Sequence, residues 1–180
     1  MSDSGTTIAT IYISSKTNYM SHNETNHTVG RFAGEVGKGL IAGVAGTLAI
    51  TLSQMIEMKI TKRKPSEAPA KAAEKVLNIP PHNPVDKKKF SQEVHWLYGT
   101  AWGLSRSVMS LLGLKGLPAI ALQFGTIYST ALIMPSSLHV APPLKEWSAK
   151  DIMIDALHHA VYAVAAGVVF DALHDNSQKE

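Results

Sequence analysis

Long uncharged stretches alternate with polar, charged ones along this chain. Residues 39–56 are eighteen consecutive positions without Asp, Glu, Lys or Arg, which is the usual length of a helix that crosses a bilayer. A second uncharged stretch separates Lys115 from Lys145. Two further segments, residues 94–113 and 151–173, are mostly apolar but carry ionisable groups. The pattern predicts an all-α protein, a four-transmembrane-helix bundle.

The polar stretches suggest one membrane domain with a tail at each end, since 180 residues suit a single compact unit. Residues 1–32 are expected to form a polar, mobile N-terminal tail, because they lack the basic start and apolar run of a signal peptide. The membrane domain is expected over residues 33–174, followed by a polar C-terminal tail over residues 175–180. Its expected parts are four helices and one long basic loop: residues 33–58, 94–113, 116–138 and 151–173, and residues 59–93.

Small residues form a stripe along the first helix. Gly39 and Gly43 have the G-x-x-x-G spacing, and Gly46 lies close by on the same segment. In lipid such a stripe lets another helix approach closely, because no side chain separates the two backbones. We therefore expect these glycines to be helix-packing positions.

Basic residues are concentrated in one connection. Residues 59–89 hold nine Lys or Arg against three Asp or Glu, a net charge of +6, whereas the chain carries +3. Because Lys and Arg accumulate in cytoplasmic loops, the loop 59–93 is expected on the cytoplasmic side of a bacterial inner (plasma) membrane, and both termini are expected on the outer side. Lys145 and Lys150 then also fall inside. The loop has few aromatic residues to stack bases, so anionic lipid headgroups are its expected partner rather than nucleic acid.

This topology places ionisable side chains from three helices at one depth, near the cytoplasmic face. Glu57 ends the first helix, His95 begins the second, and Asp155, His158 and His159 lie at the start of the fourth. Asp155 and the two histidines have i, i+3, i+4 spacing and share a helix face. Ionisable groups inside a membrane usually face the bundle interior.

Three interpretations of this polar cluster stay open. Glu57, His95, Asp155 and His158 could be ligands of a transition metal, since bundles build metal sites from carboxylates and an acid-x-x-His pair. The histidines could instead relay protons or ions. The third interpretation is structural: the groups bond to headgroups, water or one another at the membrane surface.

Arg106 lies well inside the segment 94–113 and away from this cluster. It could pair with Asp171 or Glu35, or extend outward to the membrane surface, and linking helices is its expected task. Arg106 and the polar start of the segment 151–173 also keep a soluble helical protein as an alternative.

Composition and motifs limit the chemistry. The chain has no cysteine, which excludes disulfides, thiolate metal sites and a cysteine nucleophile. It has no phosphate-binding glycine loop, no H-E-x-x-H and no G-x-S-x-G. No catalytic residue is assigned, and apart from the candidate metal no cofactor is expected.

The order of features resembles that of the YagU-like uncharacterised bacterial inner-membrane proteins. The shared pattern is a first helix of the GLIAGVAG kind, a Pro-containing polar loop, a helix opening on His95 with Gly99 and Trp102, and a last helix with His158 and His159. It spans residues 39–173, and the chain departs from it in its long N-terminal tail and more basic first loop. The resemblance implies membrane location and a stress-related role rather than a reaction.

Three functions are therefore expected as candidates. The first is a small accessory or interaction subunit of a membrane assembly, paired with other membrane subunits or with copies of itself. The second is a proton or ion conduit that uses the polar cluster. The third is a membrane-embedded metal-binding enzyme.

Overall fold

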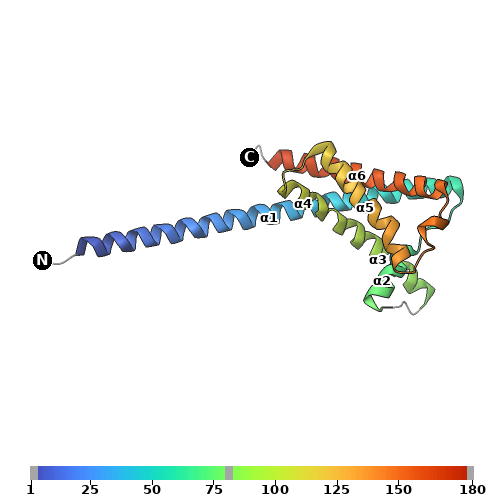
Figure 1. Ribbon diagram of the computed structural model, residues 1–180, viewed down its shortest axis with the longest axis horizontal. Coiled ribbons are helices and arrows are strands. Elements are labelled where there is room, and N and C mark those ends of the chain that lie inside the picture. The colour runs from blue at the N-terminus through green and yellow to red at the C-terminus, as the bar shows by residue number, and fades with distance from the viewer. Residues whose placement is uncertain (1–3, 80–82, 178–180) are drawn as a thin grey trace.

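The structure is a computed structural model that describes residues 4–79 and 83–177, with side chains from Thr28 onward, Pro84 excepted. Every regular element in these ranges is helical, which confirms the all-α class (Figure 1). In chain order the elements are α1 (Ser4–Thr61), α2 (Ala68–Leu77), α3 (Pro84–Trp102), α4 (Leu104–Leu111), α5 (Gly116–Ser137), the 3-10 turn η1 (Leu144–Glu146) and α6 (Ala149–Ser177).

The first helix is longer than expected. α1 has 58 residues, so the backbone of residues 4–32, expected as a polar tail, continues the helix expected over residues 33–58. The first part of α1 projects away from the other helices, and its second part packs among them (Figure 1). Residues 1–3, and residues 178–180 of the expected C-terminal tail, lie outside the described residues, and α6 extends to Ser177.

The segment expected as one helix over residues 94–113 is two helices, α3 and α4, joined at Gly103. The Gly103 N–H donates 3.0 Å to the Thr100 carbonyl, three residues back, so the backbone tightens here into a turn of 3-10 type. Gly103 is buried against α1. The change of helix therefore coincides with the point where α1 comes closest.

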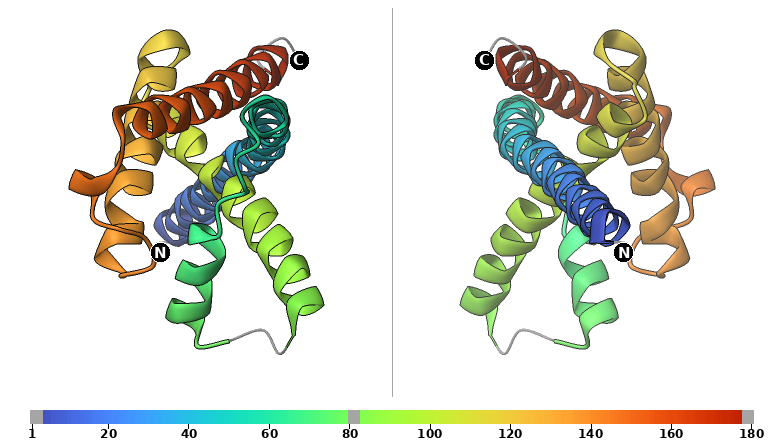
Figure 2. Two further views of the ribbon diagram at one scale, coloured as in Figure 1. Left: turned by 90° about the vertical axis from the view of Figure 1, so that its right-hand side faces the viewer. Right: turned by 90° about the vertical axis from the view of Figure 1, so that its left-hand side faces the viewer.

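Helix α1 is the centre of the packing. It lies along α6, which runs antiparallel to it, and contacts α3 and α4 on another side, while α5 packs on α6 (Figure 1). Seen along the long axis, the helices cross one another rather than lying parallel (Figure 2). The buried hydrophobic cluster at these crossings consists of Ala42, Ile50, Ile127, Tyr162, Ala166 and Phe170.

Three helices are long and apolar enough to cross a membrane. They are the part Thr28–Thr61 of α1, α5 (Gly116–Ser137) and α6 (Ala149–Ser177). Their outward faces carry large exposed apolar side chains, among them Leu48, Leu52, Val164 and Val168, as expected where lipid rather than water surrounds the helices. Three of the four expected segments are thus confirmed as candidate spans.

The basic loop is partly folded. It holds α2 and the start of α3, whose N-terminus is capped by the Asn83 side chain accepting from the backbone N–H groups of Val85 and Asp86. α2 is amphipathic and ends at Asn78 in a left-handed conformation (φ 55°). The Lys75 ammonium donates 2.7 Å to the Leu138 carbonyl. This bond holds α2 against the C-terminus of α5.

Candidate functional site at the basic end of the bundle

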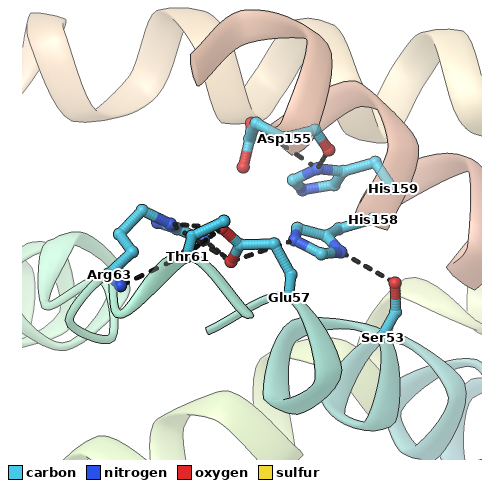
Figure 3. Close-up of polar contacts among 7 residues, drawn as sticks. All are labelled: Ser53, Glu57, Thr61, Arg63, Asp155, His158 and His159. Carbon is cyan, nitrogen blue, oxygen red and sulfur yellow. Dashed lines mark hydrogen bonds and ion pairs between the residues drawn. The ribbon is translucent and has the colours of Figure 1, made fainter. Parts of the chain in front are cut away.

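We call the end of the bundle where α1 finishes and α3 and α6 begin the basic end, because the basic loop lies there. A buried histidine joins α6 to α1 at this end. His158 is 1% exposed, its Nδ1 lies 2.8 Å from Ser53 Oγ, and its Nε2 lies 3.8 Å from Glu57 Oε2. Figure 3 shows the imidazole between the two α1 side chains. His158 therefore links α6 to α1 through a contact between residues that are 105 positions apart in the sequence.

The Glu57 carboxylate is shared with the start of the basic loop. It accepts a hydrogen bond from the Thr61 hydroxyl at 2.7 Å and another from Arg63 Nη2 at 3.0 Å (Figure 3). The carboxylate is mostly buried, and the guanidinium is exposed to 37%. Glu57 thus holds the end of α1, the loop after it and His158 together, and most of its hydrogen-bonding capacity is already used.

His159 points to a different neighbour from His158. Its Nδ1 lies 2.8 Å from the Asp155 carbonyl oxygen and 3.6 Å from Asp155 Oδ2. Its ring lies 5.6 Å from the Tyr128 ring on α5. Successive helical residues are about 100° apart around the axis, so one histidine faces α1 while the next faces α5.

His95 makes a separate contact. Its Nε2 lies 2.8 Å from Thr51 Oγ1 on α1, about two helical turns before Glu57. Among the described residues, no three His, Asp or Glu side chains lie close enough to hold a metal ion. In this structure the four expected metal ligands are divided among separate contacts: Glu57 pairs with His158, Asp155 with His159, and His95 lies apart, because residues at one depth face different helices.

The glycine stripe of α1 is used inside the chain. A Cβ on Gly43 would lie 2.2 Å from the Thr100 carbonyl oxygen of α3, and a Cβ on Gly39 would lie 2.9 Å from the Gly103 carbonyl oxygen. A Cβ on Gly46 would meet the Tyr162 ring of α6 at 2.7 Å. These three positions thus face α3 and α6, and the stripe serves close packing of this chain on itself.

A second polar cluster lies at the opposite end of the bundle. Arg106 is 1% exposed, forms an ion pair with Asp171, and lies over the Phe170 ring with its guanidinium carbon 5.2 Å from the ring centre. Of the partners expected for Arg106, the structure selects Asp171. This pair joins α4 to α6.

Glu35 completes this opposite cluster from α1. Its Oε1 lies 3.0 Å from Lys38 Nζ and 3.1 Å from His174 Nδ1, and its carbonyl accepts 2.7 Å from the Ser107 hydroxyl. From the sequence, Glu35 was expected only as a partner for Arg106, and His174 was not expected in this cluster. The i, i+3 spacing of Glu35 and Lys38 was the feature of the sequence that could have indicated their ion pair.

Comparisons with known proteins add no identity: no family model, no curated protein and no solved structure matches the chain.

Proposed function

We propose that this chain is a small integral membrane protein that acts through a partner, as an accessory or interaction subunit of a membrane assembly. The observation that supports this proposal most strongly is that the first part of α1 projects away from the other helices. Residues 28–34 are all exposed, and seven residues cover nearly two helical turns, so every side of the helix is uncovered. Val29 and Phe32 are 60% and 56% exposed.

A projecting helix with exposed large apolar side chains is a typical binding element. Helices in proteins owe most of their stability to packing against other elements rather than to intrinsic propensity. A Cβ added at Gly30 or Gly34 would meet nothing within 4 Å, so a smooth, accessible face lies on this part of α1. These features support docking of another membrane subunit or a second copy of the chain.

The proposed topology has four crossings, with α3 and α4 together forming the fourth. Residues 94–111, which follow the basic loop, would extend about 27 Å at 1.5 Å per residue, close to the apolar thickness of a bilayer of about 30 Å. The loop 59–93 lies on the cytoplasmic side of a bacterial inner membrane, near anionic headgroups, and both termini lie on the opposite side. The positive charge of the loop supports this orientation, and the motif pattern shared with the YagU-like proteins supports the location.

Site-specific crosslinking tests the partner role. A photo-reactive phenylalanine analogue at Phe32, introduced in native membranes, should give a protein adduct of defined mass. The same analogue at Val164, which is 52% exposed on α6, serves as the lipid-facing control. An adduct of twice the chain mass identifies a second copy, and another mass identifies a different subunit. Equal, diffuse crosslinking at both positions would contradict the proposal.

A proton conduit is the second candidate, favoured by the contact between His158 and Glu57. The Nε2 atom of His158 is buried without a hydrogen-bond partner among the described residues, and it faces the Glu57 carboxylate at 3.8 Å. Histidine changes charge near neutral pH and suits a relay. Beyond His158, however, the one polar side chain that α6 buries among the described residues is Tyr162, whose hydroxyl already donates to the Gly99 carbonyl. The buried positions after it are Ala163, Ala166, Gly167 and Phe170, which cannot carry a proton onward.

Proton flux into vesicles separates the two candidates. Reconstituted protein with an imposed pH gradient should show no more flux than empty vesicles if the interaction role is right. Flux that His158→Gln abolishes while leaving the helical content unchanged would replace the first candidate by the second.

A further inference from the structure

A cavity of about 400 Å³ lies at the basic end, between the bundle and α2. Its size falls within the range of small-molecule sites in proteins, about 300–1,000 Å³. Five helices contribute to it, together with Trp147 of the turn before α6. The contacts of His158 and the ion pairs of Glu57 do not use this space, so the cavity is separate from the polar pair described above.

Most of the cavity wall is apolar. The part toward the bundle centre is formed by Ile50, Trp102, Ile127 and Ala131, and the part toward the basic loop by α2. The lining face of α2 includes Val76 and Leu77, which remain 67% and 57% exposed. Because α2 lines the cavity with apolar side chains that the rest of the protein leaves exposed, an apolar group can fill the space beside them.

The polar groups of the wall are few, and they are hydrogen-bonding rather than cationic. They include His95 from α3 and His159 and Asp155 from α6. His95 uses Nε2 toward Thr51, and His159 uses Nδ1 toward Asp155. The Thr51 hydroxyl donates its own proton to the Thr47 carbonyl, and the Asp155 carbonyl can only accept, so the nitrogens in these two contacts carry the ring protons. In the neutral rings, His95 Nδ1 and His159 Nε2 are therefore acceptors. Neither has a hydrogen-bond partner among the described residues, and both are available to a head group.

Charge selects the kind of head group. Asp155 is the formally charged side chain among the lining residues. The nearby lysines of α2 are engaged elsewhere, Lys71 with Glu67 at 3.3 Å and Lys75 with the Leu138 carbonyl. An anionic head group would therefore meet a carboxylate and no free cation in the cavity, whereas an uncharged head group with hydroxyl donors meets the unprotonated nitrogens of two imidazoles.

We propose that this cavity binds an uncharged amphiphile of the bilayer, with one apolar chain and a head group that donates hydrogen bonds. The chain lies along Trp102, Ile127 and Ala131, and the head group lies between His95 and His159. Quinols and monoacylglycerols both have this chemistry. The proposal needs the membrane placement but not the partner role of α1, so a failed crosslink at Phe32 leaves it standing.

Tryptophan fluorescence gives a direct measurement, because two of the three tryptophans, Trp102 and Trp147, line the cavity. A Trp96→Phe background removes the third. In this background, full-length protein in detergent is titrated with a monoacylglycerol whose chain carries two bromine atoms, which quench indole fluorescence on contact. Saturable quenching is expected, with a short-chain quinol displacing the brominated lipid if quinols share the site and failing to displace it if the head-group pocket selects a glycerol.

Matched substitutions on α5 control the test. Ala131→Phe fills the apolar part of the cavity and should weaken binding of the brominated monoacylglycerol by roughly tenfold or more, while Ala121→Phe, on the exposed surface of the same helix, should leave binding unchanged. Circular dichroism and gel filtration confirm that both variants fold. Quenching that does not saturate, or that is equal in both variants, would overturn the proposal. Displacement of the brominated monoacylglycerol by oleate at alkaline pH, where the oleate carboxylate is ionised, would overturn the uncharged head group.

Discussion

Arg106 of α4 forms an ion pair with Asp171 of α6, and its guanidinium also covers the ring of Phe170. The arginine is almost fully buried, whereas the Asp171 side chain is 28% exposed. Two of the guanidinium nitrogens, Nε and Nη1, have no hydrogen-bond partner among the described residues. The pair thus supplies most of the compensation for a buried charge, and it links two segments that are far apart in sequence.

Removing one partner of this pair should cost more than removing both. Asp171→Asn leaves a buried, uncompensated guanidinium, and we expect a loss below the roughly 3–5 kcal/mol typical of fully buried pairs, because Asp171 is partly exposed. The double variant Arg106→Met, Asp171→Leu should be closer to the parent. Denaturation of the purified protein in mixed micelles measures both. A double variant less stable than Asp171→Asn would contradict this interpretation.

Close approach between α1 and α3 predicts a sharp difference between two glycines. A Cβ on Gly103 would lie 2.0 Å from the Gly39 carbonyl oxygen, so Gly103→Ala must push the helices apart and should cost about 1–3 kcal/mol. Gly125 on α5 has nothing within 4 Å of an added Cβ, and Gly125→Ala should gain about 0.5–1 kcal/mol of helix stability. Thermal unfolding in detergent compares them. Equal melting temperatures would show that α1 and α3 do not pack this closely.

The contact between α2 and α3 should depend on pH through Glu67. Hydrogen bonds from Lys87, and then from Lys71, lower the pKa of the Glu67 carboxyl below its ordinary value of 4.5. A lowered pKa means that these bonds stabilise the folded loop above pH 4.5 and are lost as the pH falls through the lowered value. Because the residue is exposed, the change is local rather than global.

A spin label on Val76→Cys reports this loosening of α2. Its mobility should be low near neutral pH and should rise in acid, while the Glu67→Gln variant should show the mobile spectrum already at neutral pH. The control is a label on Val164→Cys in α6, whose spectrum should not change. Identical titrations of Val76→Cys with and without Glu67 would contradict the assignment to this carboxyl.

The sequence predicted three apolar helices that could span a membrane, because their signal is local. An uncharged run such as residues 39–56 needs no knowledge of the rest of the chain to be assigned to a spanning helix. The change of helix at Gly103 has no such local signal. The residue keeps helical angles of φ −60° and ψ −26°, and the backbone tightens into a 3-10 turn at the point where α1 packs against it. α2 was missed for a similar reason: it is short, and bonds such as that from Lys75 to α5 hold it in place.

The sequence predicted the level along the helices at which the candidate site residues lie, but not which neighbouring helix each side chain faces. Alternation of helices across a membrane brought Glu57, His95 and His158 to one end, and the structure places them there. Which side chain each one faces depends on the rotation of every helix about its axis. His95 therefore meets Thr51 instead of Glu57, and His158 and His159 face different helices. Periodicity within one helix cannot supply the phase between two.

The central claim is that α3 and α4 form a fourth crossing, which puts the basic loop and the turn before α5 on opposite faces of the membrane. The cysteine-free chain allows a direct measurement: Ser66→Cys and Leu114→Cys, two substitutions that leave the charge unchanged, are each labelled with an impermeant maleimide in intact cells and after lysis. Four crossings predict labelling of Leu114→Cys in intact cells and of Ser66→Cys only after lysis. Labelling of both positions from the same side would contradict the four-span topology.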